Sequence, residues 1–169
     1  MRRSEIEAAL DQIDVIEEHF HNRERWFGKA SDQSKNNWAV AAHLTPFQVI
    51  SGNGDFGGDP SDEAKVIGTD DQPSITGMTM FDFHRVMVEA SSKSSSWVIR
   101  IIYGSGEMSV AEDAGQYTDI TVTEARKGSP IEVMMPRLTC GTDKIWARGK
   151  NANNNATLDF FVGLHEYDD

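Results

Sequence analysis

This sequence lacks the features that would cross-link the chain or hold it in a membrane. It contains one cysteine, Cys140, in 169 residues, so no disulfide can form within the chain and an oxidising compartment is not required. The isolated thiol is best explained as a small buried side chain rather than as a nucleophile. No apolar run is long enough to span a bilayer, and the start, MRRSEIEAAL, lacks the apolar core of a signal peptide. We therefore expect a protein that is made and assembled inside a cell.

Positive charge is also scarce. The chain has 16 Lys and Arg residues against 27 Asp and Glu residues, which gives a formal net charge of -11. Binding to nucleic acid depends on a basic surface that neutralises phosphates. Nucleic acid is therefore excluded as an expected partner.

The common catalytic motifs are missing as well. The sequence has no phosphate-binding P-loop, no G-x-G-x-x-G after a strand, no H-E-x-x-H and no C-x-x-C. The GSG at 104–106 does not fit the G-x-S-x-G pattern of a nucleophile elbow. We therefore expect no catalytic residues, no cofactor and no enzymatic activity.

The N-terminal segment predicts a capped helix over residues 4–28. Ser4 and Glu7 form a capping-box pattern, and Gly28 stands where a glycine often ends a helix. Seven-residue spacing relates Ile6, Ile13, Phe20 and Phe27, with Ala9 and Ile16 in between. This stripe indicates either a helix packed on its own domain or a short parallel coiled coil, in which isoleucine at both core positions favours trimers. Arg23 interrupts the pattern.

The remaining sequence is typical of a β-sheet protein. A polar linker at 29–37 is followed by short alternating runs, separated by Gly, Pro, Asn, Ser and Asp. The predicted strands are 47–50, 64–68, 79–90, 96–104, 117–124, 130–136, 144–150 and 156–167, with a helical turn or two possible in MSVAEDAG. The Asn-rich GKNANNNAT predicts a turn that joins the last two strands as a hairpin. Strands at this spacing indicate a sandwich or barrel.

The last strand has two different faces. Its apolar face consists of Leu158, Phe160, Val162 and Leu164, and its mixed face consists of Asp159, Phe161, Gly163, His165 and Tyr167. Because the first face is fully apolar, we expect this strand inside a sheet with that face in the core. A mixed aromatic face is often covered by a neighbouring chain, so Phe161 and Tyr167 are expected at an interface.

Two places could bind a metal ion. Asp82 and His84 share a strand face two positions apart, and a third ligand from a neighbouring strand, for example Glu132, would complete a site. The preferred interpretation of this pair is a polar face that meets water or another subunit. The loop SGNGDFGGDPSDEAK could bind calcium, but it lacks the EF-hand spacing and is better explained as a solvated loop. Its acidic residues are Asp55, Asp59, Asp62 and Glu63.

The segment at 129–169 carries a resemblance. SPIEVMMPRLTCGTDKIWARGKNANNNATLDFFVGLHEYDD resembles the closing strands of trimeric jelly rolls of the tumour-necrosis-factor type, which end on a central aromatic strand. The layout of the chain, a short N-terminal segment before a β-rich body, is similar to that of virion proteins of tailed bacteriophages. The resemblance implies a capsid decoration (cement) protein or a head spike, and it carries no catalytic residues.

Together these observations predict a mainly β protein, a jelly-roll-like antiparallel β-sandwich preceded by one N-terminal α-helix. The expected organisation is a helix at 1–28, a linker at 29–37 and a sandwich at 38–169. The expected function is that of a homotrimeric decoration protein bound to the major capsid protein on the virion surface, assembled in the host cytoplasm. The interface residues are expected to be Ile6, Ile13, Ile16, Phe20, Phe27, Phe161 and Tyr167.

Two other functions remain open. A glycan- or receptor-binding spike would need exposed aromatic rings, for which Trp97 and Trp146 are candidates. A cupin-like metalloenzyme would use Asp82 and His84.

Overall fold

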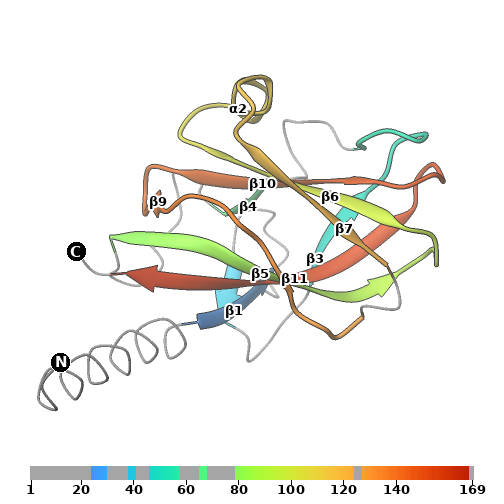
Figure 1. Ribbon diagram of the computed structural model, residues 1–169, viewed down its shortest axis with the longest axis horizontal. Coiled ribbons are helices and arrows are strands. Elements are labelled where there is room, and N and C mark those ends of the chain that lie inside the picture. The colour runs from blue at the N-terminus through green and yellow to red at the C-terminus, as the bar shows by residue number, and fades with distance from the viewer. Residues whose placement is uncertain are drawn as a thin grey trace, which may run out of the picture.

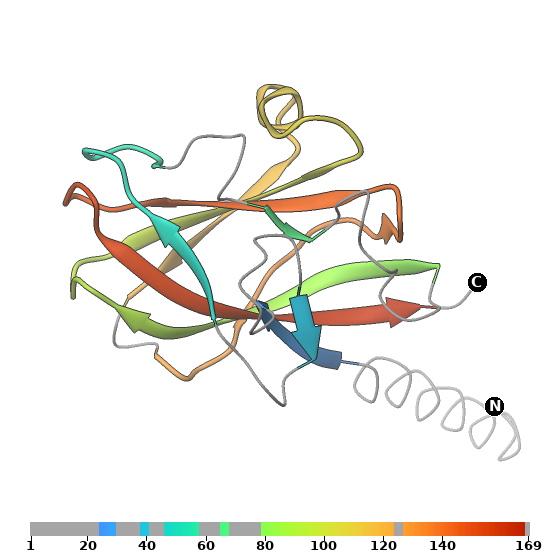
Figure 2. The same ribbon diagram turned by 180° about the vertical axis from the view of Figure 1, so that it is seen from behind.

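The computed structural model describes residues 24–29, 38–40, 46–57, 65–67, 79–123 and 127–167. These residues form two antiparallel sheets packed face to face, with one short helix (Figures 1 and 2). The mainly β, sandwich-like architecture predicted from the alternation is confirmed. No helix among these residues has the length and apolar character needed to cross a membrane.

The larger sheet is built around two long neighbouring strands, β5 (Met80–Ser91) and β11 (Thr157–Tyr167). Its other strands are β1 (Glu24–Lys29), β2 (Trp38–Val40), β3 (Phe47–Ile50), β8 (Ile131–Glu132) and β9 (Leu138–Thr139). The main order is β2-β1-β11-β5-β8, with β3 also pairing β11 and β9 also pairing β5. The final strand therefore lies in the middle of this sheet, as its apolar pattern predicts.

The smaller sheet has the order β4-β10-β6-β7. Its strands are β4 (Lys65–Ile67), β6 (Trp97–Gly104), β7 (Tyr117–Val122) and β10 (Lys144–Lys150). The helix α2 (Met108–Asp113) occupies the predicted MSVAEDAG segment between β6 and β7. It buries Met108 and Ala111 in a small cluster with Ile102 and Trp146, on the side of the sheet opposite the main core.

The main core fills the space between the two sheets. From β11 it receives Leu158, Phe160, Val162 and Leu164, the four residues of the predicted apolar face. From β6 it receives Trp97, Ile99 and Ile101, which alternate along the strand. Burial of these side chains drives the two sheets together.

The Asn-rich turn joins the two sheets instead of closing a hairpin, so this prediction was wrong. Strand β10 belongs to the smaller sheet and β11 to the larger one, and residues 151–156 cross between them. Asn151 is buried, and its side-chain amide donates to the Ser96 carbonyl at 3.1 Å. Ser51 accepts the Ala156 amide at 3.1 Å. These hydrogen bonds satisfy polar groups in a buried corner, which alternation alone does not reveal.

The predicted N-terminal helix is wrong where the structure describes the chain. Residues 24–29 form β1, antiparallel to β11, and Phe27 is a 2 % exposed core residue rather than a position on a helical stripe. The described part of the chain contains no coiled-coil helix. The segment ERWFGK can adopt either period because it is short, and pairing with β11 overrides its local preference.

The rest of that helix lies outside the described residues. This includes the expected interface residues Ile6, Ile13, Ile16 and Phe20. Three acidic residues of the possible calcium loop, Asp59, Asp62 and Glu63, also fall outside, while Asp55 is exposed in a turn.

Candidate metal centre

A row of three ionisable residues crosses the larger sheet on the face away from the core. Glu24 on β1 is paired with His165 on β11, and His165 is paired with Asp82 on β5. Residues directly opposite one another in antiparallel strands point to the same face. Since Phe83 and Leu164 fill the core from the adjacent positions, the row must lie on the opposite face.

A second histidine, His84, lies on the same face at a β-bulge in β5. The register of β5 and β11 shifts so that Gly163 pairs with Arg85 and Leu164 pairs with Phe83. His84 is thereby the extra residue, and two residues separate the core side chains Phe83 and Val86. Bulges commonly redirect side chains in this way.

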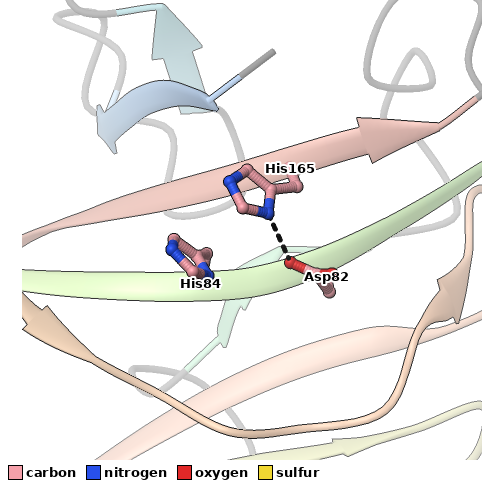
Figure 3. Close-up of side chains that lie close together, drawn as sticks. All are labelled: Asp82, His84 and His165. Carbon is pink, nitrogen blue, oxygen red and sulfur yellow. Dashed lines mark ion pairs between the residues drawn. The ribbon is translucent and has the colours of Figure 1, made fainter. Parts of the chain in front are cut away.

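Asp82, His84 and His165, which we call the metal triad, form a compact group (Figure 3). One possible ligand atom from each residue lies within 4.8 Å of the other two. The His84 and His165 rings stack with centroids 4.0 Å apart and an interplanar angle of 25°. Asp82 Oδ1 lies 3.5 Å from His165 Nδ1. Three side chains with lone pairs therefore converge from two strands.

The surroundings keep the buried histidine neutral. Burial lowers the pKa of His165 below its usual value, and the neighbouring His84 lowers it further. Asp82 and Glu24 act in the opposite direction without cancelling these effects. A neutral imidazole has the lone pair that a metal ion requires.

Tyr167 positions the Asp82 carboxylate. Its hydroxyl donates to Asp82 Oδ2 at 2.6 Å, and the Arg137 guanidinium lies 4.0 Å from the Tyr167 ring centroid. Burial and the bond to Asp82 raise the pKa of Tyr167 to about 12. The other oxygen, Asp82 Oδ1, is buried and has no hydrogen-bond partner among the described residues.

The two carboxylate oxygens of Glu24 also differ in their hydrogen bonding. Its Oε2 accepts a hydrogen bond from Arg85 at 3.1 Å, whereas Oε1 is buried with no hydrogen-bond partner in the described part of the chain. Gly163 provides the room for this carboxylate, because a Cβ at that position would lie 2.7 Å from Glu24 Oε1. Buried carboxylate oxygens without partners are costly, so two of them beside one histidine call for an explanation.

The sequence identified part of this site. It paired Asp82 with His84 and offered Glu132 as an example of a third ligand. Glu132 instead has a 73 % exposed side chain and an ion pair with Arg85 at 3.7 Å, and His165 occupies the third position. A change of parity in the apolar pattern of β5, from Phe81 and Phe83 to Val86 and Val88, is the sequence signal that could have revealed the bulge.

The other residues singled out in the sequence lie elsewhere. Phe161 is half-buried on the outer face of β11, and Tyr167 is buried next to Asp82. Trp97 and Trp146 are buried, at 0 % and 5 % exposed, so neither offers an open ring to a sugar. Cys140 is half-buried, and burial raises the pKa of its thiol to about 11.

No protein family, curated protein or solved structure matches this chain. The evidence for a function therefore comes from the site itself and from the resemblance in the sequence.

Proposed function

We propose that this protein is a structural β-sandwich protein that binds a divalent transition-metal ion, of which Zn²⁺ is the representative, at the metal triad. The observation that carries this proposal is the convergence of three ligand atoms within 4.8 Å of one another on two paired strands. Around Zn²⁺, with bonds of about 2.0–2.1 Å, tetrahedral ligand atoms are separated by roughly 3.4 Å. Small side-chain rotations would bring the three atoms to this separation.

The ligand types favour a transition metal over calcium or magnesium. Two of the three groups are imidazoles, which suit Zn²⁺ and its neighbours, whereas Ca²⁺ and Mg²⁺ prefer an all-oxygen shell. The lowered pKa of His165 leaves it neutral and ready to bind near neutral pH. Asp82 Oδ1, which is buried without a hydrogen-bond partner among the described residues, supplies the carboxylate ligand.

A role in stability fits the burial of this site better than a role in catalysis. His165 is only 4 % exposed, and its position between β1 and β5 places the metal where it would hold three strands together. An ion that binds the folded state and not the unfolded chain stabilises the fold in proportion to its concentration and affinity.

Metal titration of chelator-treated protein tests the proposal. One Zn²⁺ per chain should bind by calorimetry and raise the melting temperature, and Mg²⁺ should do neither. His84→Ala and Asp82→Asn should abolish the Zn²⁺-dependent shift. Asp113→Asn is the matched control, because Asp113 is an exposed carboxylate on α2. Absence of stoichiometric binding, or unchanged binding by His84→Ala, would overturn the proposal.

We also propose that the protein serves in a virion, as a homotrimeric decoration protein with a jelly-roll-like arrangement, bound to a major capsid protein. The resemblance of residues 129–169 motivates this. The central position of the aromatic strand β11 in a two-sheet sandwich and the half-buried Phe161 on its outer face support it. Burial of Trp97 and Trp146 removes the aromatic candidates that motivated the glycan-binding alternative.

Two measurements test this second proposal. Native mass spectrometry should show a trimer at micromolar concentration or after addition of the capsid protein. Proteomics of purified virions should detect the chain in stoichiometric amounts. A chain that stays monomeric in both settings and is missing from virions would contradict the proposal.

A further inference from the structure

We infer that Glu24 is a fourth protein ligand, which closes the coordination sphere of the metal triad and fastens β1 to β11 and β5. This inference rests on the proposed metal site and adds to it the ligand that makes the site structural. Four protein ligands are the mark of structural zinc sites, whereas catalytic sites leave one position open.

The strand register places Glu24 beside the triad. His165 lies between Glu24 on one side and Asp82 on the other, because it pairs with both. Directly opposed side chains in antiparallel strands have Cβ atoms roughly 5 Å apart. Glu24 is outside the group whose ligand atoms lie within 4.8 Å of one another, so rotation of its side chain would bring it to an ion bound to His165 and Asp82.

The two carboxylates have the same arrangement of partners. In each, one oxygen is held by a donor outside the triad: Tyr167 holds Asp82 Oδ2 at 2.6 Å, and Arg85 holds Glu24 Oε2 at 3.1 Å. In each, the second oxygen is buried and lacks a hydrogen-bond partner among the described residues. Metal-binding carboxylates are commonly oriented in this way by outer hydrogen bonds. A shared cation would bind both oxygens that lack a hydrogen-bond partner.

The space left by Gly163 also favours Glu24 as a ligand. Gly163, two residues before His165, leaves open the volume that Glu24 Oε1 occupies, and any Cβ there would come within 2.7 Å of that oxygen. The Glu24 carboxylate is thus seated over β11 with its side chain 11 % exposed. This seat places the Glu24 carboxylate over Gly163 on β11, beside the strand position paired with His165.

The charge of the site also favours Glu24 as a ligand. A buried divalent ion needs compensating negative charge. Asp82 and Glu24 together supply two negative charges, which balance a divalent ion because histidines bind metals as neutral imidazoles. Arg85 keeps a second anionic partner, Glu132, at 3.7 Å.

The test compares Glu24→Gln with Glu132→Gln, which removes the other carboxylate partner of Arg85 and serves as the matched control. Co²⁺ replaces Zn²⁺ as a spectroscopic probe, because its visible absorption is intense when four-coordinate and weak when six-coordinate. Wild type and Glu132→Gln should give the intense spectrum. Glu24→Gln should bind Co²⁺ and Zn²⁺ at least about ten-fold more weakly and lose the intense band.

A second variant tests the role of Glu24 even if Glu24→Gln fails to fold. Gly163→Ala keeps the carboxylate but displaces it, so it should weaken metal binding and reduce the Co²⁺ band as Glu24→Gln does. Gly106→Ala is its control, since nothing lies within 4 Å of a Cβ at that position. Hydrogen exchange should show that Zn²⁺ slows the amides of residues 24–29 in wild type and leaves them unchanged in both site variants.

The measurements distinguish failure of the metal site from failure of Glu24 as its fourth ligand. If the wild type binds neither Zn²⁺ nor Co²⁺, the metal site itself fails and the role of Glu24 fails with it. If wild type binds both ions and Glu24→Gln matches it in affinity, spectrum and exchange of β1, the triad stands and only the fourth ligand is overturned.

Discussion

Tyr167, at the end of β11, and Asp82, on β5, are joined by a 2.6 Å hydrogen bond. The bond fixes one oxygen of the carboxylate and turns the other toward His165, whose Nδ1 lies 3.5 Å away. The last residue of β11 thus contributes directly to the geometry of the metal triad.

Tyr167→Phe should therefore weaken metal binding without removing a ligand. Loss of an outer hydrogen bond of this kind typically costs about 10–100-fold in metal affinity, and a hydrogen bond to a charged group is worth about 1.5–3 kcal/mol. We expect Zn²⁺ titration to show at least a ten-fold weaker Kd, with the stoichiometry kept. Tyr103→Phe is the control, because Tyr103 is a half-buried tyrosine on β6 of the other sheet. Equal affinity in the two variants would contradict this role of Tyr167.

The two neighbouring phenylalanines of β11 should respond differently to truncation. Phe160 is 0 % exposed in the main core, so Phe160→Ala should leave a cavity and lower the free energy of unfolding by about 3–5 kcal/mol in urea titrations. Phe161 is half-buried on the other face, so Phe161→Ala should cost the protomer much less. If the proposed trimer forms through this face, Phe161→Ala should shift native mass spectra toward monomer. A comparable loss of protomer stability in both variants would be the contrary result.

Cys140 should react slowly with thiol reagents in the native protein. Burial, and then the nearby Glu166, raise its pKa to about 11, whereas an unperturbed thiol has a pKa of about 8.5. The native alkylation rate should therefore reach half its maximum near pH 11, while the denatured chain should do so near pH 8.5. A native midpoint near the ordinary value would show that the thiol is solvated.

The same pKa difference predicts a pH dependence of stability. Because the folded pKa is raised, the folded state holds the thiol proton more tightly than the unfolded chain. This contribution is intact below about pH 8.5 and is lost as the pH rises toward about 11. Cys140→Ala should lose less stability than wild type across that interval in thermal melts.

Deleting residues 158–169 should abolish soluble expression. The deletion removes the strand that pairs with β1, β3 and β5, which exposes their edges and half of the core. A truncated chain that remains soluble and melts cooperatively would show that β11 is a peripheral arm and would move the functional surface to the C-terminus.

Local patterns in the sequence were sufficient to place most of the strands. The two faces of β6 and β11 follow from period-two alternation, because each face meets only one environment, core or exterior. The helix α2 also falls where its short helical pattern predicts it. The same reasoning failed at β1, where six residues are too few to separate the two periods and the partner strand decides.

Only part of the metal triad could be predicted from local patterns in the sequence. Asp82 and His84 were visible as a pair because they are two positions apart on one strand. His165 could not be linked to them, since it lies more than eighty positions further along the chain and only the register of β11 against β5 brings it opposite Asp82. The bulge at His84 also depends on that pairing.

The sequence by itself determined which side chains enter the core, since burial follows the alternation of apolar residues along each strand. It also determined the acidic character of the chain and the absence of common catalytic motifs. Only the tertiary structure decided which strands pair and in what register. Pairing depends on backbone hydrogen bonds between distant segments, which no local pattern encodes. That register placed Glu24, His165 and Asp82 in one row and so created the candidate metal centre.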